Sequence, residues 1–338
     1  MTELQPLLTV VVPAYNSQDY LDRAMTTLVD YGDDVEVIIV DDGSKDNTAQ
    51  LADLWAARYD MVRVIHQENK GHGGAVNAGV AQARGTYVRV VDSDDWLDRS
   101  ALRALLRVLR SECQSGSLVD LVITNYVYEK VGKTHKAVVR YRNVLPVGPT
   151  IGWDEFRGCR YDQYILMHAL TMRTEIVRKS GLHLPEHTFY VDYLYSYVPL
   201  PLVRTMRYLD VDLYRYFIGR DDQSVNEKVM IMRLDQLARV NRAMVEATPA
   251  KGTVPDELYR YMVHYLRINF TVCSVMAQLS GTQEHARLSA QLWENIETRS
   301  PEVAKDLEKD LLAVLVRKAS PRFVRAVYTA ARFVLGFN

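Results

Sequence analysis

The first 125 residues alternate apolar runs with amphipathic stretches, and this alternation restricts the fold more than any other feature of the chain. A continuous apolar run is typical of a strand buried on both faces of a sheet, and residues 7–12 form such a run. Further strands are expected over residues 35–40, 62–65, 86–91 and near 119–125. Apolar residues at helical spacing predict helices over residues 18–30, 46–59, 73–83 and 98–111. This succession predicts parallel βαβ units in an open α/β sheet.

The remainder of the chain divides into two segments of different character. Residues 126–225 are irregular, rich in tyrosine and broken by prolines, and we interpret them as a mixed layer at one edge of the sheet. From residue 226 the pattern is helical, and it predicts helices over 226–247, 255–280, 282–298, 301–318 and 321–335. A serine followed by a proline marks the start of each of the last two. We therefore predict domains over residues 1–125, 126–225 and 226–338.

Charge and cysteine content exclude several classes of protein. The 338 residues carry 41 basic and 42 acidic side chains, for a formal net charge of −1, which argues against a nucleic-acid partner. The three cysteines form no CxxC pair, so neither a disulfide framework nor a thiolate zinc site is predicted. We see no basic and apolar leader, and no uncharged apolar run of about 18 residues. These observations predict a cytoplasmic protein without membrane-spanning helices.

Polar residues gather where the predicted strands end. They form the segments 13–16 (Pro-Ala-Tyr-Asn), 41–44 (Asp-Asp-Gly-Ser) and 92–95 (Asp-Ser-Asp-Asp). One such cluster alone is ordinary turn or helix-cap chemistry. Because the ligands of open parallel sheets bind beyond the carboxyl ends of the strands, the three clusters together predict one shared site.

The glycines of the chain do not form a familiar nucleotide-binding motif. The first strand is followed by neither GxGxxG nor GxxxxGK[ST], which disfavours a Rossmann dehydrogenase and a P-loop NTPase. A glycine-rich stretch instead follows the third strand, at residues 69–79. Lys70 and the backbone amides of a helix start there are suited to a diphosphate. The alternative is that the glycines only allow a helix to pack closely on the sheet.

The segment Asp92-Ser93-Asp94 is the sharpest local feature. Residues two apart in an extended segment point to the same side, so two carboxylates face one way. Hard carboxylate oxygens suit Mg²⁺ or Mn²⁺ together with the oxygens of a diphosphate. The position of this DxD segment at the end of a buried strand strengthens the prediction of a metal site.

These motifs together resemble glycosyltransferase family 2, whose members have the GT-A fold. The resemblance rests on Val11–Asn16, Val40–Asp46, Asn69–Gly79 and Asp92–Asp95, in that order. It implies transfer of a sugar from a nucleoside diphosphate sugar to an acceptor hydroxyl, with inversion at the anomeric carbon, and UDP is the nucleotide by analogy. The resemblance covers residues 7–97, fades through 126–225 and does not extend to 226–338.

The resemblance also implies roles for individual residues. Asp94 would bind the metal, and Arg220, in a loop over 219–226, would reach the diphosphate. Family members carry a carboxylate base in an acidic pair after the irregular middle segment. Asp192 is the catalytic base by this correspondence and Glu186 the reserve, although Val191 replaces the first acid of the pair. The donor would be bound by Pro13, Tyr15, Asn16, Asp41, Asp42, Lys70, Gly74, Asn77, Asp92 and Ser93.

Two other functions are compatible with parts of the pattern. A sugar-phosphate nucleotidylyltransferase has a similar sheet, but its glycine-rich, arginine-containing first loop is missing here. A non-catalytic subunit that binds the nucleotide sugar would keep the donor site and lack the base, and Val191 favours this alternative. The Gln-x-x-Arg-Trp motif of processive synthases is absent. We therefore expect the transfer of one sugar at a time to a cell-surface or lipid-linked glycan.

Two features remain open. The histidines at 72, 168, 183 and 187 either bind metal or phosphate or are structural. After Asp310 the chain has no acidic residue, and the segment 319–338 is basic and carries aromatic residues. This segment either lies on an anionic membrane face or packs against the protein, including at a homodimer contact.

Overall fold

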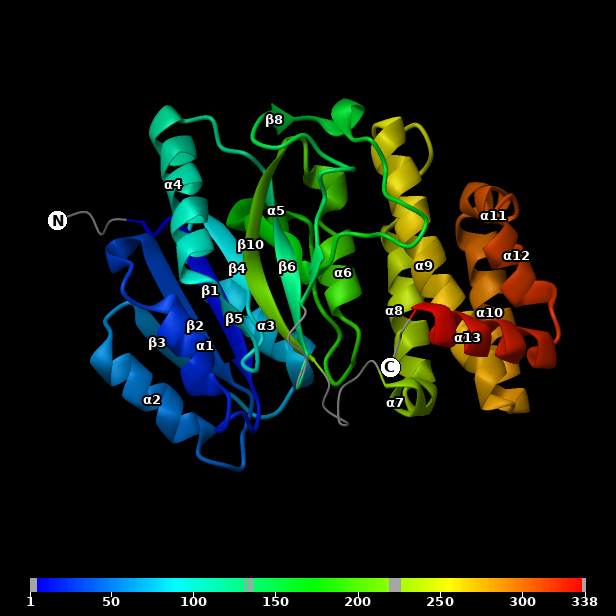
Figure 1. Ribbon diagram of the computed structural model, residues 1–338, viewed down its shortest axis with the longest axis horizontal. Coiled ribbons are helices and arrows are strands. Elements are labelled where there is room, and N and C mark those ends of the chain that lie inside the picture. The colour runs from blue at the N-terminus through cyan, green and yellow to red at the C-terminus, as the bar shows by residue number, and fades with distance from the viewer. Residues whose placement is uncertain (1–4, 131, 133–135, 219–225, 336–338) are drawn as a thin grey trace. The chain divides into compact units, whose positions relative to one another are not determined.

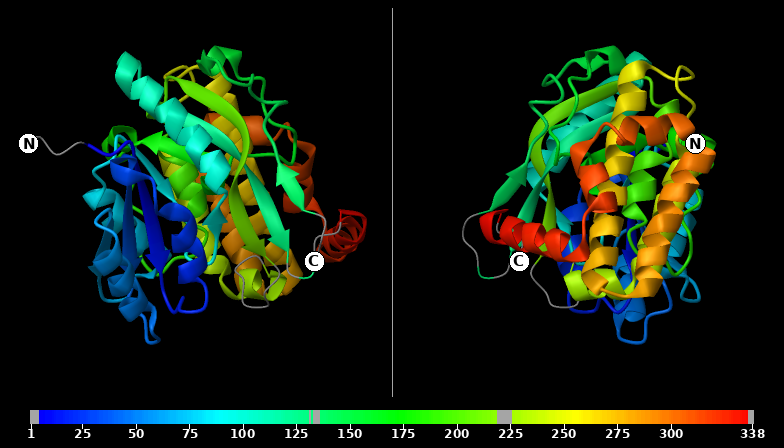
Figure 2. Two further views of the ribbon diagram at one scale, coloured as in Figure 1. Left: turned by 60° about the vertical axis from the view of Figure 1, so that its left-hand side comes forward. Right: turned by 90° about the vertical axis from the view of Figure 1, so that its right-hand side faces the viewer.

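A computed structural model describes residues 5–130, 132, 136–218 and 226–335 of the chain (Figures 1 and 2). The chain forms two compact units. The first unit comprises residues 1–159 and 165–220, and the second comprises residues 160–164 and 221–338. The candidate site residues that the structure describes all belong to the first unit. The predicted functional division at residues 125 and 225 stays a prediction.

A single mixed sheet organises the first unit, with the strand order β3-β2-β1-β4-β9-β6-β10-β5. Strands β1, β2, β3 and β4 are parallel neighbours, as predicted, and β10 runs parallel to β6. Strand β9 lies antiparallel between β4 and β6. The open, mostly parallel α/β architecture is thereby confirmed. The strands are β1 (Leu8–Ala14), β2 (Val35–Asp41), β3 (Val62–His66), β4 (Tyr87–Val90), β5 (Trp96–Leu97), β6 (Leu121–Lys130), β7 (Ala137–Val139), β8 (Thr150–Ile151), β9 (Leu170–Arg173) and β10 (Met206–Ile218).

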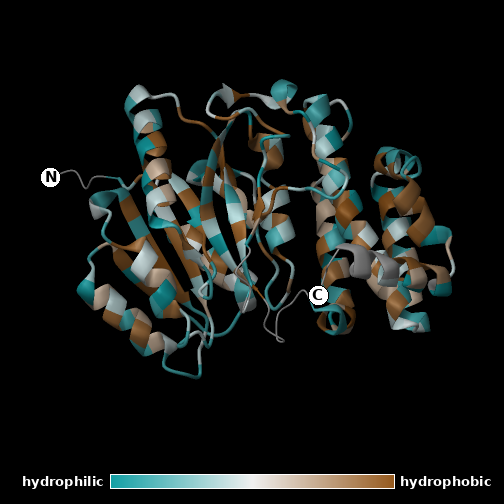
Figure 3. Ribbon diagram, viewed as in Figure 1, coloured by the Kyte–Doolittle hydropathy of each residue, from teal (hydrophilic) through white to brown (hydrophobic). Residues whose placement is uncertain are grey.

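The central strands are covered on both faces. Every residue of β1, β2 and β4 is buried, and Figure 3 shows the apolar character of these strands. Burial on both faces explains why their sequences are mostly apolar rather than alternating, with Glu36 in β2 and Arg89 in β4 as buried charged exceptions. The helices of this unit are α1 (Leu21–Leu28), α2 (Thr48–Arg58), α3 (Gly71–Gln82), α4 (Arg99–Ser115), α5 (Thr174–Lys179) and α6 (Asp192–Tyr197).

Two helix ends show why the sequence folds locally as it does. Asp98 caps α4, because its side chain accepts hydrogen bonds from the backbone amides of Ser100 and Ala101. Gly79 lies in α3 against β1, where an added Cβ would lie 2.2 Å from a methyl carbon of Val11. At this position the close-packing interpretation of the glycine-rich stretch therefore applies.

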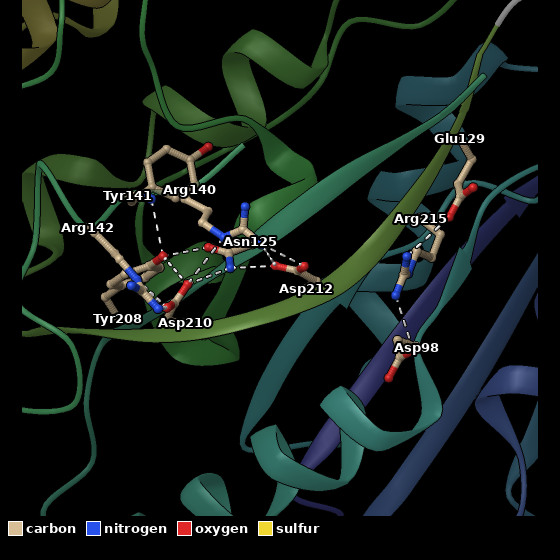
Figure 4. A network of polar contacts seen from close by, with 10 residues as sticks. All are labelled: Asp98, Asn125, Glu129, Arg140, Tyr141, Arg142, Tyr208, Asp210, Asp212 and Arg215. Atoms are coloured by element: carbon tan, nitrogen blue, oxygen red, sulfur yellow. Dashed lines mark hydrogen bonds and ion pairs between the residues drawn. The ribbon is translucent and has the colours of Figure 1, made fainter. Parts of the chain in front are cut away.

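Strand β10 was not predicted from the sequence. Its residues lie within the tyrosine-rich segment and are buried or partly buried without a regular alternation, and its pairing with β6 shifts register between Leu209 and Asp212 and again before Tyr214. Such bulges bend a strand and redirect its side chains. Figure 4 shows the polar contacts around this bulge. Tyr208 donates to Asn125, and Asn125 in turn donates to Asp210 and Asp212, each at 2.8 Å.

The second unit is helical. Two of the predicted helices are each divided: 226–247 at Arg233, and 301–318 at residues 308–310. Asp310 explains the second break, because its carboxylate accepts from the amide of Ala313 and caps a new helix. No described helix is long and apolar enough to cross a membrane. The helices are α7 (Glu227–Met232), α8 (Leu234–Ala247), α9 (Asp256–Ser280), α10 (Gln283–Arg299), α11 (Pro301–Leu307), α12 (Leu311–Lys318) and α13 (Pro321–Leu335).

Candidate active site

The three polar clusters predicted at strand ends do meet. The backbone amide of Asn16 donates to Ser44 at 3.0 Å, and the side chain of Asn16 accepts from the amide of Lys45 at 2.8 Å. The hydroxyls of Ser17 and Ser93 share a hydrogen bond of 2.7 Å in a buried position. Segment 13–17 therefore bridges the ends of β2 and β4. In this segment Pro13 is buried and Tyr15 is exposed.

At the end of β2, two buried carboxylates hold the neighbouring loops. Asp41 accepts from the amide of Ser44 at 3.1 Å and contacts His66 at 3.0 Å. One carboxylate oxygen of Asp42 accepts from the side chain of Gln67 at 2.7 Å and from the amide of Lys70 at 2.9 Å. The other oxygen, Oδ2, is buried and has no hydrogen-bond partner among the described residues. It is a ready acceptor for a donor group of a ligand.

Loop 183–188 lies against the start of α3. The side chain of Asn77 donates to the carbonyl of Leu184 at 2.8 Å and accepts from its amide at 3.0 Å. The ammonium of Lys70 lies 3.4 Å from Glu186, and both side chains are about half exposed. Gly74 is buried, and a Cβ there would lie 2.3 Å from Cβ of Lys70. Asn77 and Gly74 thus have structural roles here in addition to their predicted ones.

At the end of β4, Asp92 pairs with His72 across 2.8 Å. Burial disfavours the charged form of each group, but the pairing outweighs it, so the pKa of Asp92 is lowered and that of His72 is raised. His72 reaches Asp92 from the first turn of α3. The glycine-rich helix start therefore contributes an imidazole whose protonated form is favoured by its pairing with the DxD segment.

Asp95 is fully buried behind the DxD segment. Its carboxylate accepts from the hydroxyl of Tyr214 at 2.6 Å and from the amide of Phe217 at 2.7 Å. Burial, together with the carboxylates of Asp94 and Asp92, raises the pKa of Asp95 well above its usual range. The β10 bulge aims Tyr214 at this carboxylate. A crowded group of acids at one place favours a bound cation.

His168 completes that group. Its ring stacks on Tyr214 with centroids 4.5 Å apart, and its Nδ1 is buried without a described partner. Burial lowers the pKa of His168 to about 4, so its imidazole is neutral. Ligand atoms of Asp92, Asp95 and His168 lie within 4.8 Å of one another. Two carboxylates and a neutral imidazole are a donor set that Mn²⁺ accepts readily, whereas Mg²⁺ prefers oxygen alone.

Asp94, the predicted metal ligand, is half-buried beside this group. Its carbonyl accepts from the guanidinium of Arg23 at 2.6 Å, and that guanidinium lies over the rings of Trp96 and Phe217. The backbone of the DxD segment is thus clamped by an arginine from α1.

Asp192, the predicted base, begins α6 and is half-buried. Burial raises its pKa to about 6; the charge of His72 lowers this pKa and that of Asp92 raises it. Asp192 therefore lies close to the DxD segment although about 100 residues separate them in sequence. Its pKa is suited to accepting a proton near neutral pH. Arg220 lies outside the described residues.

The sequence left His168 open, as one of four histidines that either bind metal or phosphate or are structural. It did not single out Tyr214, which is one of many tyrosines, or Arg89, which lies within a predicted strand. The only available signal was charge or polarity at a position where a buried strand calls for an apolar residue, and Arg89 alone shows it.

Comparisons with known proteins agree with this geometry. Residues 9–165 match the family model described as glycosyl transferase family 2. Chondroitin synthase of Escherichia coli is 36% identical over 128 residues, which are 38% of this chain and 18% of that protein. The match covers less than half the length of several of these curated relatives, 37%, 40% and 29% in three of them.

Solved structures resemble nearly the whole chain in fold. Staphylococcus aureus TarS 1–349 in complex with UDP-GlcNAc has a TM-score of 0.67 at 17% identity, covering 96% of this chain and 92% of that one. A mannosyltransferase from Pyrobaculum calidifontis, in complex with GDP-Man and Mn²⁺, has a TM-score of 0.53 at 17% identity, covering 93% and 87%. The chain is thus similar to glycosyltransferase family 2 over residues 9–165, and its sheet has the architecture of the GT-A fold that these solved structures share.

Proposed function

We propose that this chain is an inverting glycosyltransferase that moves one sugar from a nucleoside diphosphate sugar, with UDP as the expected nucleotide, to an acceptor hydroxyl of a glycan. The position of Asp192 carries this proposal. A carboxylate with a pKa of about 6 lies beside the acids of a DxD segment, which brings a base and a metal-binding group to one place. The chemistry of such a transfer needs both.

The donor side follows from the strand ends. The unpartnered Oδ2 of Asp42 would accept a hydrogen bond from the base or ribose, with Asp41, Pro13, Tyr15 and Asn16 around it. Lys70 would face the diphosphate. The diphosphate would then replace or share Glu186 as the ion-pair partner of the Lys70 ammonium. Asp92 and Ser93 would lie nearest the ribose, Asn77 and Gly74 on the diphosphate side.

Asp92, Asp94, Asp95 and His168 are the residues that would hold a divalent cation, with Mn²⁺ matching the mixed donor set. A bound cation would offset the negative charge that develops on the leaving diphosphate. Asp192 would accept the proton of the acceptor hydroxyl as that oxygen attacks the anomeric carbon. Holding both substrates in line supplies further acceleration.

Peripheral contact with a membrane is the partner proposal for α13. The side chains of Phe323 and Val327 are exposed to 49% and 43% and lie one turn apart, and Arg322 is exposed beside them. An anionic surface attracts basic residues by about 1 kcal/mol each. Sedimentation with anionic vesicles should show binding that salt weakens and Phe323→Ser removes. If the wild type and Phe323→Ser bind the vesicles equally, the proposal is contradicted.

Thermal stabilisation tests the donor site directly. UDP, GDP, CDP and dTDP would each be added with and without Mn²⁺ to the wild type and to Asp94→Ala. A ligand at 100 times its Kd adds about 2.7 kcal/mol of stability. We expect a metal-dependent shift with UDP that the variant loses. A transfer assay on Asp192→Ala then separates an enzyme from a donor-binding subunit without a base, since only the enzyme loses a measurable rate.

A further inference from the structure

Arg89 is a charged side chain at the centre of the sheet. It lies on β4 between Val88 and Val90, three residues before Asp92, and is fully buried. Burying a charge is costly unless the charge is paired or serves another purpose. An apolar residue at this position would pack in the same core without that cost.

The contacts of Arg89 are with neutral groups. Its guanidinium donates to the hydroxyl of Thr171 at 2.7 Å and to the backbone carbonyl of His168. It lies 5.9 Å from the ring centroid of Tyr214. Burial lowers the pKa of Arg89 to about 10, so it remains a cation at neutral pH. Among the described residues it forms no ion pair, and its Nε has no hydrogen-bond partner.

A second buried arginine shows what a paired one looks like. Arg267, on α9 of the helical unit, lies 3.5 Å from the carboxylate of Asp310 and 3.7 Å from the ring centroid of Tyr161. Its charge is balanced locally, as a structural ion pair requires. Arg89 has no such partner, so structure alone does not account for its charge.

The groups that His168 and Tyr214 contact in turn offer a reason for the positive charge of Arg89. His168, whose carbonyl Arg89 holds, stacks on Tyr214, and Tyr214 donates to Asp95. Contacts through His168 and Tyr214 therefore connect the guanidinium to the acids of the candidate site. A fixed cation behind a group of carboxylates favours their ionised forms and the anionic ligands that bind among them, and it needs no rearrangement to do so.

We propose that Arg89 is a positioning residue of the donor site, which fixes His168 through its carbonyl and supplies a buried positive charge to the acids and the diphosphate. This inference rests on the proposed function, because it assumes that a metal and a nucleotide bind beside Asp92. It assigns the charge at position 89 to ligand binding and not to stability.

The substitution Arg89→Met separates these two roles, since methionine is unbranched and apolar. Replacing an unbalanced buried charge by an apolar group is commonly neutral or stabilising. We expect the urea midpoint of the variant to equal or exceed that of the wild type, while its affinity for Mn²⁺ with UDP falls about tenfold or more. Arg89→Lys keeps the positive charge but loses the paired N–H donors of the guanidinium. Its affinity for Mn²⁺ with UDP should lie between those of the wild type and Arg89→Met.

Arg267→Met is the matched control. It removes a buried arginine whose partner Asp310 then remains, so its urea midpoint should fall while calorimetric binding of Mn²⁺ and UDP stays at the wild-type level. A lowered midpoint of Arg89→Met with unchanged affinity would overturn the inference alone. Absence of nucleotide and metal binding in the wild type would instead overturn the proposed function, and the role of Arg89 with it.

Discussion

The carboxylates at the ends of β2 and β4 come from similar sequences, Asp-Asp-Gly-Ser and Asp-Ser-Asp-Asp, yet they are used differently. At the β2 end, Asp41 and Asp42 accept from donors of two loops, 42–47 and 67–70, and both are buried. At the β4 end, Asp95 is crowded by two other acids, which raise its pKa together with burial. The β2 pair does not include a third acid, whereas the β4 group concentrates negative charge even though Asp95 accepts two hydrogen bonds from the protein.

This difference shows how to separate structural from ligand-binding acids on such a sheet edge. Acids that accept several protein hydrogen bonds each stabilise the fold in the absence of any ligand. Acids that lie against one another destabilise the fold until a cation or a proton joins them. Variants at the two strand ends should therefore affect different measurements.

The comparison predicts the largest loss of activity at Asp192, which lies near the acids at the end of β4. Asp192→Asn should lower kcat about 10²- to 10⁴-fold, because the general base is lost. Its unfolding free energy in urea should not fall. Glu186→Gln is the control, and we expect it to keep kcat within a few-fold. A kcat of Asp192→Asn near that of the wild type would exclude this residue as the base.

The next largest expected effect is the fall of kcat at acidic pH. Asp192 acts as a base only when ionised, and burial raises its pKa to about 6. The rate should therefore fall about tenfold for each pH unit below 6 and level off above that value. A kcat profile between pH 4.5 and 8 measures this. The residual activity of Asp192→Asn should lack the inflection, and a persisting inflection would assign it to another group.

At the β2 end the prediction concerns stability. Asp41→Asn should lower the unfolding free energy by about 1–3 kcal/mol, because buried hydrogen bonds to Ser44 and His66 are weakened. Urea unfolding measures the change, and kcat should remain within a few-fold of the wild type. A loss of rate comparable to that of Asp192→Asn, with stability intact, would show that the two strand ends do not differ as described.

The smallest effect sharpens the role of Lys70, which lies between the two strand ends. Lys70 pairs with Glu186 on the surface, and such pairs contribute about 0.2–1 kcal/mol. If Lys70 faces the diphosphate, Lys70→Met should raise the KM for the donor a few-fold, and Glu186→Gln should lower it slightly. If both variants lose the same small amount of stability and keep the KM of the wild type, Lys70 has no role in donor binding beyond its ion pair with Glu186.

The parts of this molecule that sequence predicts best are those with local causes. Strands β1 to β4 were predicted because their sequences are mostly apolar and separated by helical patterns, and the meeting of segments 13–16, 41–44 and 92–95 follows from parallel topology. The proximity of Asp192 to the DxD segment came from family resemblance alone. About 100 residues separate Asp192 from the DxD segment, and no local sequence pattern indicates that two such distant segments lie together.

The residues that were missed depend on contacts between distant segments. Strand β10 was not predicted because its two bulges interrupt the alternation that a strand normally shows. Its position decides where Tyr214 lies, and Tyr214 in turn contacts Asp95 and His168. The break at Asp310 was missed for a different reason, since an acid within a helical pattern is also typical of an exposed helix face.

The pairing of β5 has a consequence for how the protein is made. Strand β5 directly follows the DxD segment, and it pairs with Tyr214 and Arg215 of β10. During synthesis, β1 to β4 have their parallel partners once about 100 residues have emerged, whereas β5 waits for more than another 100. Contacts between such distant segments form slowly. The end of the sheet where we propose that metal binds should therefore be among the last regions to become ordered, so an incomplete chain would lack this site.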